Sequence, residues 1–238
     1  MIPVFESSAT QTTVLMTVYQ TPVHYLRQAV ESILCQTEHD FIFMILLDGY
    51  HQHEQLRCIA EYDDGRLWVE QIEHVGLTEA LNVGLREITT PFIMRQDADD
   101  YSSPLRLRAM LKGMEDSSIG ALGDNYAVVS ETGKLMRINT ANPEDVPPDR
   151  YKSHGLAGTL AGAGSMLRTS GVKQVGGWKY PVAQDCYMMH ALKAKGWRIV
   201  SLRNTYYYWR QVPTSISHTR KAEQQMCVQA ILQEFPPQ

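Results

Sequence analysis

The chain has 238 residues, enough for one large domain or two small ones. Its 44% hydrophobic and 20% charged residues are typical of a folded protein and exclude a disordered or fibrous one. The 26 acidic and 22 basic residues give a net charge of −4, which argues against nucleic acid as a partner. The longest apolar run, Phe41 to Leu47, is too short to span a membrane, and no signal-peptide pattern is visible. A cytoplasmic protein is therefore expected.

The cysteines and histidines give little indication of a metal site. The four cysteines are widely spaced and form no Cys-x-x-Cys pair, so neither a zinc ribbon nor a redox motif is predicted. His51 and His53 have no third ligand nearby in the sequence and are a weak metal signal.

The first part of the chain alternates predicted strands with predicted helices. Apolar and β-branched residues predict strands at 14–18, 41–47, 67–72 and 92–94. Apolar residues at helical spacing predict helices over 25–34, 77–88 and 105–111. This alternation is typical of right-handed βαβ units in a mostly parallel sheet. The predicted fold class is therefore α/β, in which ligands bind beyond the carboxyl ends of the strands.

The second part is less regular. Residues 139–150 are polar and proline-rich, which predicts a loop. Residues 155–164 contain too much glycine for a stable helix, and they are a candidate lid or a close packing contact. The other predicted elements are a helix over 185–195, strands at 199–202 and 206–209, and a tail helix over 218–235.

Two of the predicted strands end in aspartates at the ligand-binding edge of the sheet. Asp48 follows the second strand, and Asp97, Asp99 and Asp100 follow the fourth. Three carboxylates within four residues repel one another unless a cation or a basic group offsets their charge. Carboxylates and substrate phosphates together hold Mg²⁺ or Mn²⁺ in enzymes that act on nucleotides. A divalent-cation site and a solvated acidic turn are both consistent with this cluster.

Seven segments of the chain form an ordered pattern from about Thr13 to about Ser217. They are VLMTVYQTPVHYLRQAVESILCQT, MILLDG, GLTEALNVGL, MRQDADDYSSPLRL, GSMLRTSGVKQVGGW, QDCYMMHALKAKGWRI and YWRQVPTSIS. In this order and spacing the chain resembles the family 2 glycosyltransferases, which have the GT-A fold, a Rossmann-like sandwich with a mostly parallel central sheet. The resemblance implies one domain over residues 1–238. Its implied parts are a nucleotide-sugar-binding half at about 11–100, an acceptor half at about 101–217 and a helical tail at 218–238.

The resemblance also implies a role for individual residues. Tyr19 is implied to lie beside the nucleotide base, and Asp48 to accept a hydrogen bond from a uracil-type ring. The residues implied to bind the nucleotide sugar are Tyr19, Asp48, Asn82, Arg95 and Asp97. Asp99 is implied to coordinate the divalent cation, Mn²⁺ or Mg²⁺, that bridges the diphosphate. Asp185 is implied to be the catalytic base.

The chemistry of sugar transfer explains why these residue types are needed. Negative charge develops on the departing diphosphate, and a divalent cation stabilises it. The acceptor hydroxyl needs a carboxylate to take its proton, and Asp185 begins a predicted helix whose dipole favours its ionised form. One base implies a single displacement with inversion. The resemblance thus implies a metal-dependent inverting glycosyltransferase that uses a UDP-sugar, in preference to a dTDP- or GDP-sugar.

The implied acceptor is a hydroxyl of a glycan or a lipid-linked molecule, in surface polysaccharide biosynthesis. A lipid-linked acceptor would add peripheral association with the inner face of the membrane. Gln184 stands where the family has Glu, and Val212 where many members have His, which keeps a non-catalytic nucleotide-sugar-binding relative as an alternative. A sugar nucleotidyltransferase is a further alternative, but TVYQTP lacks the glycine-rich phosphate loop that it needs. A dehalogenase-like phosphohydrolase is disfavoured because Tyr101 replaces its Thr or Val.

Overall fold

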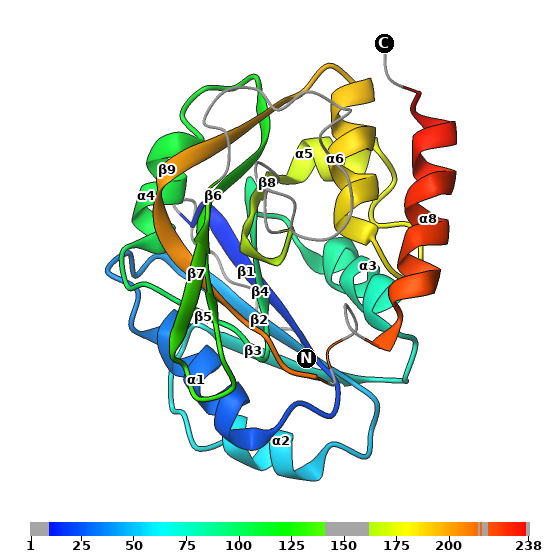
Figure 1. Ribbon diagram of the computed structural model, residues 1–238. Helices are drawn as coiled ribbons and strands as arrows, with labels where there is room; N and C mark the ends of the chain where they lie inside the picture. The colour runs from blue at the N-terminus through cyan, green and yellow to red at the C-terminus, as the bar shows by residue number, and fades with distance from the viewer. Residues whose placement is uncertain (1–9, 141–161, 214, 216–218, 237–238) are drawn as a thin grey trace.

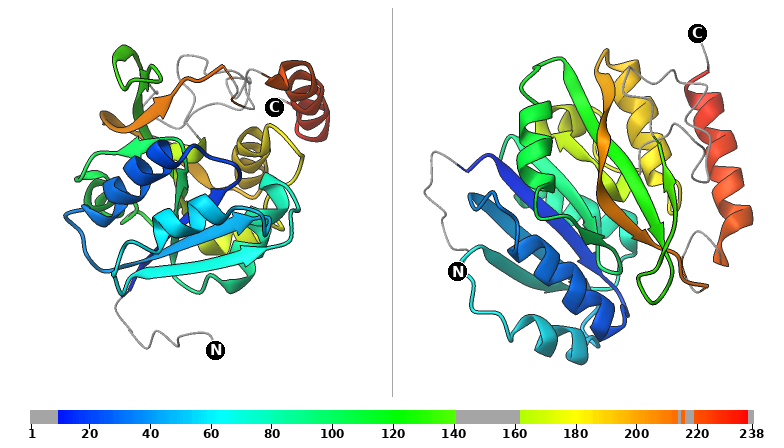
Figure 2. Two further views of the ribbon diagram at one scale, coloured as in Figure 1. Left: turned by 90° about the horizontal axis from the view of Figure 1, so that it is seen from below. Right: turned by 60° about the vertical axis from the view of Figure 1, so that its left-hand side comes forward.

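The computed structural model describes residues 10–140, 162–213, 215 and 219–236. In this part of the chain a nine-stranded sheet carries helices on both faces (Figures 1 and 2). The strands are β1 (Thr12–Val18), β2 (Phe41–Asp48), β3 (Leu67–Ile72), β4 (Phe92–Asp97), β5 (Tyr101–Ser102), β6 (Ile119–Val129), β7 (Leu135–Asn139), β8 (Met166–Arg168) and β9 (Arg198–Arg210). The helices are α1 (Val23–Leu34), α2 (His53–Ile59), α3 (Leu77–Glu87), α4 (Arg106–Gly113), the 3₁₀ helix η2 (Gly162–Gly164), α5 (Thr169–Gln174), α6 (Gln184–Ala194) and α8 (Lys221–Glu234).

The order of the strands creates a topological switch point beside β1. The order is β3-β2-β1-β4-β8-β6-β9-β5, and β7 pairs with β6. The strands β3, β2, β1 and β4 are parallel, with Val18 opposite Leu47 and Thr17 opposite Asp97. The chain passes from β1 to β2 and β3 on one side and returns to β4 on the other side of β1, and α/β sheets bind ligands at such a reversal. The predicted α/β fold with a parallel central sheet is confirmed.

The two faces of the sheet bury two separate apolar cores. Val14 and Met16 of β1 belong to the core shared with α1, α2 and α4, whereas Leu15 belongs to the core shared with α3, α5 and α6. Successive side chains of a strand point to opposite faces, so a strand buried on both faces is apolar throughout, as the sequence of β2 is. On the outer side of α6, α8 packs through Ile231 against Tyr187.

The second half of the sheet differs from the sequence prediction. The strands predicted at 199–202 and 206–209 are one strand, β9, which pairs in parallel with β6. The elements α2, β6, β7 and α5 were not predicted. The predicted tail helix is α8. Residues 141–161, which contain most of the predicted loop and of the glycine-rich stretch, lie outside the described residues.

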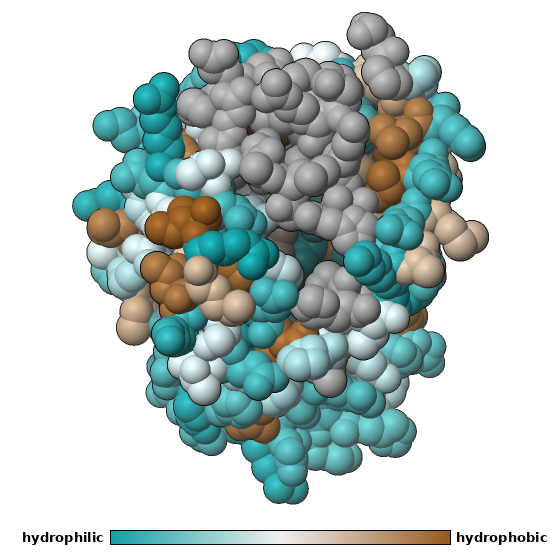
Figure 3. Space-filling model, in the orientation of Figure 1, coloured by the Kyte–Doolittle hydropathy of each residue, from teal (hydrophilic) through white to brown (hydrophobic). Residues whose placement is uncertain are grey.

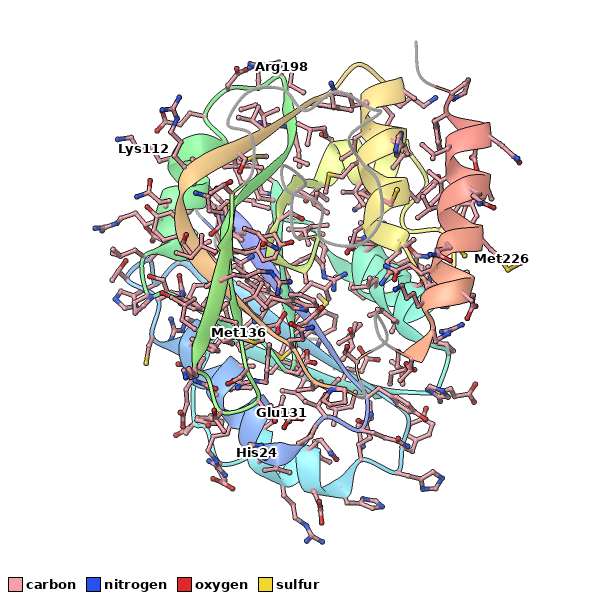
Figure 4. All side chains as sticks on the ribbon, in the orientation of Figure 1. His24, Lys112, Glu131, Met136, Arg198 and Met226 are labelled. Atoms are coloured by element: carbon pink, nitrogen blue, oxygen red, sulfur yellow. The ribbon has the colours of Figure 1, made fainter. Side chains whose placement is uncertain are left out.

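Exposed apolar side chains occur on β7 and α8. Leu135, Met136 and Ile138 of β7 and Met226 of α8 are each more than half exposed. Figure 4 shows Met226 pointing away from the rest of the molecule, and Figure 3 shows apolar surface over the β6–β7 hairpin. Among the described residues, no helix combines the length and the apolar character needed to cross a bilayer.

Candidate active site

One group of predicted site residues lies beyond the carboxyl ends of β1 and β2. Asp48 ends β2 and is 2% exposed. Its Oδ1 accepts the N–H of Val75 at 2.7 Å, and its Oδ2 accepts the N–H of Gly76 at 3.0 Å and lies 3.1 Å from Nδ1 of His74. The ring of Tyr19 stacks on that of His74, with the centroids 4.2 Å apart. Asp48 therefore fixes the turn before α3 and orients an aromatic pair.

The buried Gln52 holds the backbone on either side of Tyr19. Its Nε2 donates to the carbonyl of Val18 at 3.0 Å, and its Oε1 accepts the N–H of Gln20 at 2.8 Å. Gln20 has a φ of +50°, which side chains with a Cβ rarely adopt, so these bonds support a strained turn. Tyr19 itself is 48% exposed. The turn thus presents an aromatic surface at the switch point.

The turn after β4 brings three carboxylates together. Oxygen atoms of Asp97, Asp99 and Asp100 all lie within 4.8 Å of one another. Asp100 is buried, and it accepts hydrogen bonds from the hydroxyl of Tyr207 at 2.5 Å and from the N–H of Arg210 at 2.7 Å. Burial, and then the charges of Asp99 and Asp97, raise the pKa of Asp100 well above its ordinary value. Asp100 therefore ties the acidic turn to β9.

Asp99 has a more available carboxylate than Asp100. Its side chain makes no hydrogen bond to another described residue, while its backbone carbonyl accepts Nε of Arg210 at 2.9 Å. Burial, and then the charge of Asp97, raise the pKa of Asp99 to about 6. A divalent cation favours the ionised carboxylate and so opposes both effects. The donor set fits a hard cation held by Asp99, with Asp97 beside it.

Arg95 of β4 links the acidic turn to the second part of the chain. Its Nη2 donates to Oδ1 of Asp97 at 2.7 Å, and its backbone N–H donates to the carbonyl of Ser165 at 2.9 Å. The guanidinium carbon lies 6.0 Å from the centre of the Trp178 ring. Arg95 is 2% exposed, and its Nε and Nη1 have no hydrogen-bond partner in the described structure.

Asp185 belongs to the same group of charges although it comes from a different part of the chain. It is the second residue of α6, where the positive end of the helix dipole favours a carboxylate. Burial raises its pKa to about 6, with the charge of Arg95 opposing the rise and that of Asp97 adding to it. Its carboxylate makes no hydrogen bond to a described residue. Gly162 packs against it so closely that a Cβ on Gly162 would lie 1.9 Å from Cγ of Asp185.

The side-chain amide of Asn82 is occupied by the backbone of Trp178. Nδ2 donates to the Trp178 carbonyl at 2.9 Å, and Oδ1 accepts the Trp178 N–H at 2.8 Å. Gly177 has a φ of +84°, and a Cβ there would lie 2.4 Å from Oδ1 of Asn82, so both its backbone and its contact require glycine. Asn82 thereby positions Trp178, whose ring faces Arg95. A direct contact of Asn82 with a donor stays a prediction.

The structure thus gathers the predicted residues into two groups around the switch point. The first contains Tyr19 and Asp48, and the second contains Arg95, Asp97, Asp99 and Asp185. Two residues that touch these groups, His74 and Trp178, were not identified from the sequence, whereas Gly162 belongs to the glycine-rich stretch that was predicted as a lid or a close packing contact. The paired glycines before Trp178 were a usable signal of close backbone approach, whereas the spacing of His74 gave none. The two departures from the family pattern, Gln184 and Val212, are both buried.

Comparison with known proteins identifies the family. The model of the family described as glycosyl transferase family 2 matches residues 13–186. The chain therefore belongs to glycosyl transferase family 2, and the resemblance noted from its seven segments is confirmed.

Named relatives and solved structures agree with this assignment. The Escherichia coli O-antigen biosynthesis glycosyltransferase WbnJ is 29% identical over 115 residues, which are 48% of this chain and 45% of WbnJ. The chain spans about half the length of the curated relatives that it matches first.

Two solved structures share the fold at low identity. Staphylococcus aureus TarS 1-349 in complex with UDP-GlcNAc superposes with a TM-score of 0.75 at 16% identity, over 96% of this chain and 68% of TarS 1-349. The Pyrobaculum calidifontis mannosyltransferase PcManGT in complex with GDP-Man and Mn²⁺ gives a TM-score of 0.66 at 16% identity, over 90% of this chain and 60% of PcManGT. At such identity the likeness establishes the fold, which is the GT-A fold expected from the sequence.

Proposed function

We propose that the chain is a metal-dependent inverting glycosyltransferase, which transfers a sugar from a UDP-sugar to a hydroxyl of a glycan or lipid-linked acceptor. The observation that carries the proposal is the clustering of the carboxylates of Asp97, Asp99 and Asp100 within 4.8 Å of one another, with Arg95 paired to Asp97 at 2.7 Å. The charges of Arg95 and Asp97 also act on Asp185 at the start of α6. Membership of glycosyl transferase family 2 supports it, and so does the UDP-GlcNAc bound by TarS.

In this proposal the nucleotide binds at the switch point between β1 and β4. The base stacks beside Tyr19, which is half exposed and held by its contact with His74. Asp48 contributes at the edge of the base, and its remaining acceptor capacity suits the N–H of a uracil ring. The rest of the donor extends toward Asp97 and Arg95, with Asn82 acting through the position of Trp178.

Asp99, with Asp97 beside it, would hold the divalent cation, Mn²⁺ or Mg²⁺. When bound, such a cation stabilises the negative charge on the departing diphosphate. The close carboxylates and the raised pKa of Asp99 support this assignment, as does the Mn²⁺ in the PcManGT complex. Asp100 supports the turn from below by its two bonds to β9.

Asp185 takes the proton of the acceptor hydroxyl as that hydroxyl attacks the anomeric carbon. With a pKa of about 6 the carboxylate is mostly ionised at neutral pH, yet more basic than an exposed aspartate. Among the described residues its carboxylate has no hydrogen-bond donor, which supports a role as proton acceptor. A single base acting in one displacement inverts the configuration at the anomeric carbon.

The biological setting follows from the same proposal. The O-antigen role in the name of WbnJ supports surface polysaccharide biosynthesis. We propose that the chain acts as a single catalytic domain in the cytoplasm, at the inner face of the membrane when its acceptor is lipid-linked.

The substitution Asp185→Asn tests the central assignment. The variant keeps the size of the side chain and removes its basicity, so UDP affinity should stay within about twofold while transfer falls by about 10²–10⁴-fold. The matched control is Asp116→Asn, which changes an exposed aspartate paired with Arg198 and should keep full transfer. Transfer by Asp185→Asn at the wild-type rate would remove Asp185 as the base. UDP-sugar binding by the wild type without transfer or hydrolysis, over a broad acceptor panel, would instead identify a non-catalytic relative.

A further inference from the structure

Arg95 is a buried cation with an incomplete set of hydrogen bonds. It is 2% exposed and donates to Asp97 through Nη2 alone, while Nε and Nη1 have no partner in the described structure. Arg106, which is 0% exposed, lacks a partner at Nε alone, while its Nη1 and Nη2 donate to Gln96, Ser102 and the carbonyl of Arg95. A buried charged donor without an acceptor destabilises the fold. Such a group inside an acidic cluster indicates a missing ligand.

The surroundings of Arg95 indicate which class of ligand it could bind. Its Nη2 lies 2.7 Å from Oδ1 of Asp97, and its positive charge lowers the pKa of Asp185. The ring of Trp178 lies 6.0 Å from the guanidinium, and sugars commonly lie against such apolar faces. Under the proposed function, the group that must lie between the acidic turn and the base is the transferred sugar.

We propose that Arg95 binds the transferred sugar of the donor, with its Nε–H and Nη1–H donating to two oxygen atoms of that sugar. This inference rests on the proposed function and adds the substrate group that Arg95 recognises. Both free groups are donors, so the ligand atoms are acceptors, such as hydroxyl or acetamido oxygens. Arg95 is thus a sugar-specificity residue, separate from the groups that bind the nucleotide.

The surrounding charges favour an uncharged sugar. Arg95 already pairs with Asp97 and has Asp185 in range, so two carboxylates surround one guanidinium. A carboxylate on the sugar would add a third negative charge at this position and be repelled. The same argument places the diphosphate elsewhere, toward the cation at Asp99. The sugar is therefore a neutral hexose or N-acetylhexosamine.

The test compares the affinities of UDP and of UDP-sugars in two variants of Arg95. Arg95→Lys keeps the positive charge beside Asp97 but lacks the planar set of N–H donors, and Arg95→Gln removes the charge. Calorimetric titration in Mn²⁺ with UDP, UDP-glucose, UDP-galactose, UDP-N-acetylglucosamine and UDP-glucuronate identifies the sugar that the wild type prefers. We expect Arg95→Lys to lower the affinity for that UDP-sugar about 10-fold or more, and the affinity for UDP by less than about twofold. UDP-glucuronate should show no such sugar-dependent loss.

The controls separate recognition from folding. Arg168→Lys is the matched control, because Arg168 donates to the backbone carbonyls of Ile119 and Met114 and does not reach the acidic turn. Circular dichroism and thermal melting establish that each variant is folded. An equal loss of UDP and UDP-sugar would make Arg95 a diphosphate or structural residue and overturn the inference, as would no loss of either. A wild type that binds no uridine nucleotide would overturn the proposed function itself, which is a distinct result.

Deoxygenated donors sharpen the assignment to two oxygen atoms. Removing an oxygen that Arg95 binds should lower the affinity of the wild type for the donor about 10-fold and leave the affinity of Arg95→Lys unchanged. Removing any other oxygen should lower the affinities of both proteins equally. A set of 2-, 3-, 4- and 6-deoxy UDP-sugars therefore identifies the atoms directly. Equal penalties in both proteins for every analogue would overturn a contact between Arg95 and the sugar.

Discussion

Asp48 and Asp185 are both aspartates of the candidate site, yet their surroundings are opposite. The carboxylate of Asp48 is 2% exposed and faces three protein donors, from Val75, Gly76 and His74. The carboxylate of Asp185 makes no hydrogen bond to a described residue and lies against the backbone of Gly162. The first is stabilised by hydrogen bonds within the fold, whereas the second has packing and charge interactions but no hydrogen bond among the described residues.

The contrast extends to the two halves of the site. On the β1–β2 side, Gln52 and Asp48 use their hydrogen bonds to shape turns, so that part of the site is formed before any ligand arrives. On the β4–α6 side, the carboxylates of Asp99 and Asp185 and the Nε and Nη1 of Arg95 have no hydrogen-bond partner among the described residues. Polar groups left unpaired inside a fold are costly and are typical of places where a ligand completes the structure. We therefore expect substitutions on the second side to change catalysis and the recognition of the sugar and the cation, and those on the first side to weaken UDP and UDP-sugar equally and to lower stability.

Beside Asp185→Asn, the largest effect is expected for Asp99→Asn. Loss of the charge removes the ligand proposed for the cation, so transfer should fall by about 10³-fold and Mn²⁺ should no longer strengthen UDP binding. Calorimetric titration of UDP with and without Mn²⁺ measures the second effect separately from activity. Asp116→Asn serves as the control and should retain the Mn²⁺ dependence. An Asp99→Asn variant whose UDP affinity still rises with Mn²⁺ would show that the cation binds elsewhere.

The next largest effect is expected for Gly162→Ala. The new Cβ would lie 1.9 Å from Cγ of Asp185, so the carboxylate or η2 must move. A displacement of this order at a reacting group costs about 10²-fold in rate, while UDP affinity should hold because Tyr19 and Asp48 are not touched. Gly65→Ala is the matched control, since nothing lies within 4 Å of its Cβ and its φ is ordinary. Full transfer by Gly162→Ala would mean that the position of Asp185 is not critical.

The third prediction concerns pH. Asp185 must be ionised to accept a proton, and its pKa is raised to about 6, so at saturating Mn²⁺ kcat/KM should fall about tenfold for each pH unit below 6 and level off above it. A raised pKa in the folded state means that ionisation destabilises the fold, so the stability present below the ordinary value near 3.8 is lost as pH rises through 6. Asp185→Asn should therefore melt at a higher temperature than the wild type at pH 8, with the difference vanishing near pH 4. A flat rate profile from pH 5 to 8, or equal melting of the two proteins at pH 8, would contradict this prediction.

The parallel half of the fold was predictable from local patterns because its strands are buried on both faces. A continuous apolar run such as Phe41 to Leu47 predicts a central strand, because such a strand is buried on both faces. The other half was not, because β6 contains Gly120, Gly123, Asp124 and Asn125, which are poor strand formers. Tertiary contacts stabilise it instead. Gly120 admits the ring of Trp197, and the buried Asp124 accepts the N–H of Tyr206 on the neighbouring strand.

The site was predictable where its residues follow strands, and much less so elsewhere. Asp48 and Asp97 end strands, so a strand prediction already places them at one edge of the sheet. Asp185 needed the resemblance to a family, because a helix start on its own gives no position relative to β4. The unpaired donors of Arg95 could not be predicted from the sequence. Whether a buried guanidinium has acceptors depends on every segment that packs around it.

The smallest effect is expected for Asp48→Asn, which tests the β1–β2 side of the site. The amide can still accept the N–H of Val75 with its oxygen, but its NH₂ group would then face the N–H of Gly76, donor against donor. Stability should fall by about 1–3 kcal/mol, and UDP and UDP-sugar should both weaken several-fold and equally. This equal loss is the opposite of the selective loss expected at Arg95. The control Asp40→Asn alters an exposed aspartate that accepts a bond from Thr10 and should change neither affinity. If Asp48→Asn lowered transfer 10²-fold without weakening UDP, Asp48 would belong to the reacting side, and the division between the two halves would fail.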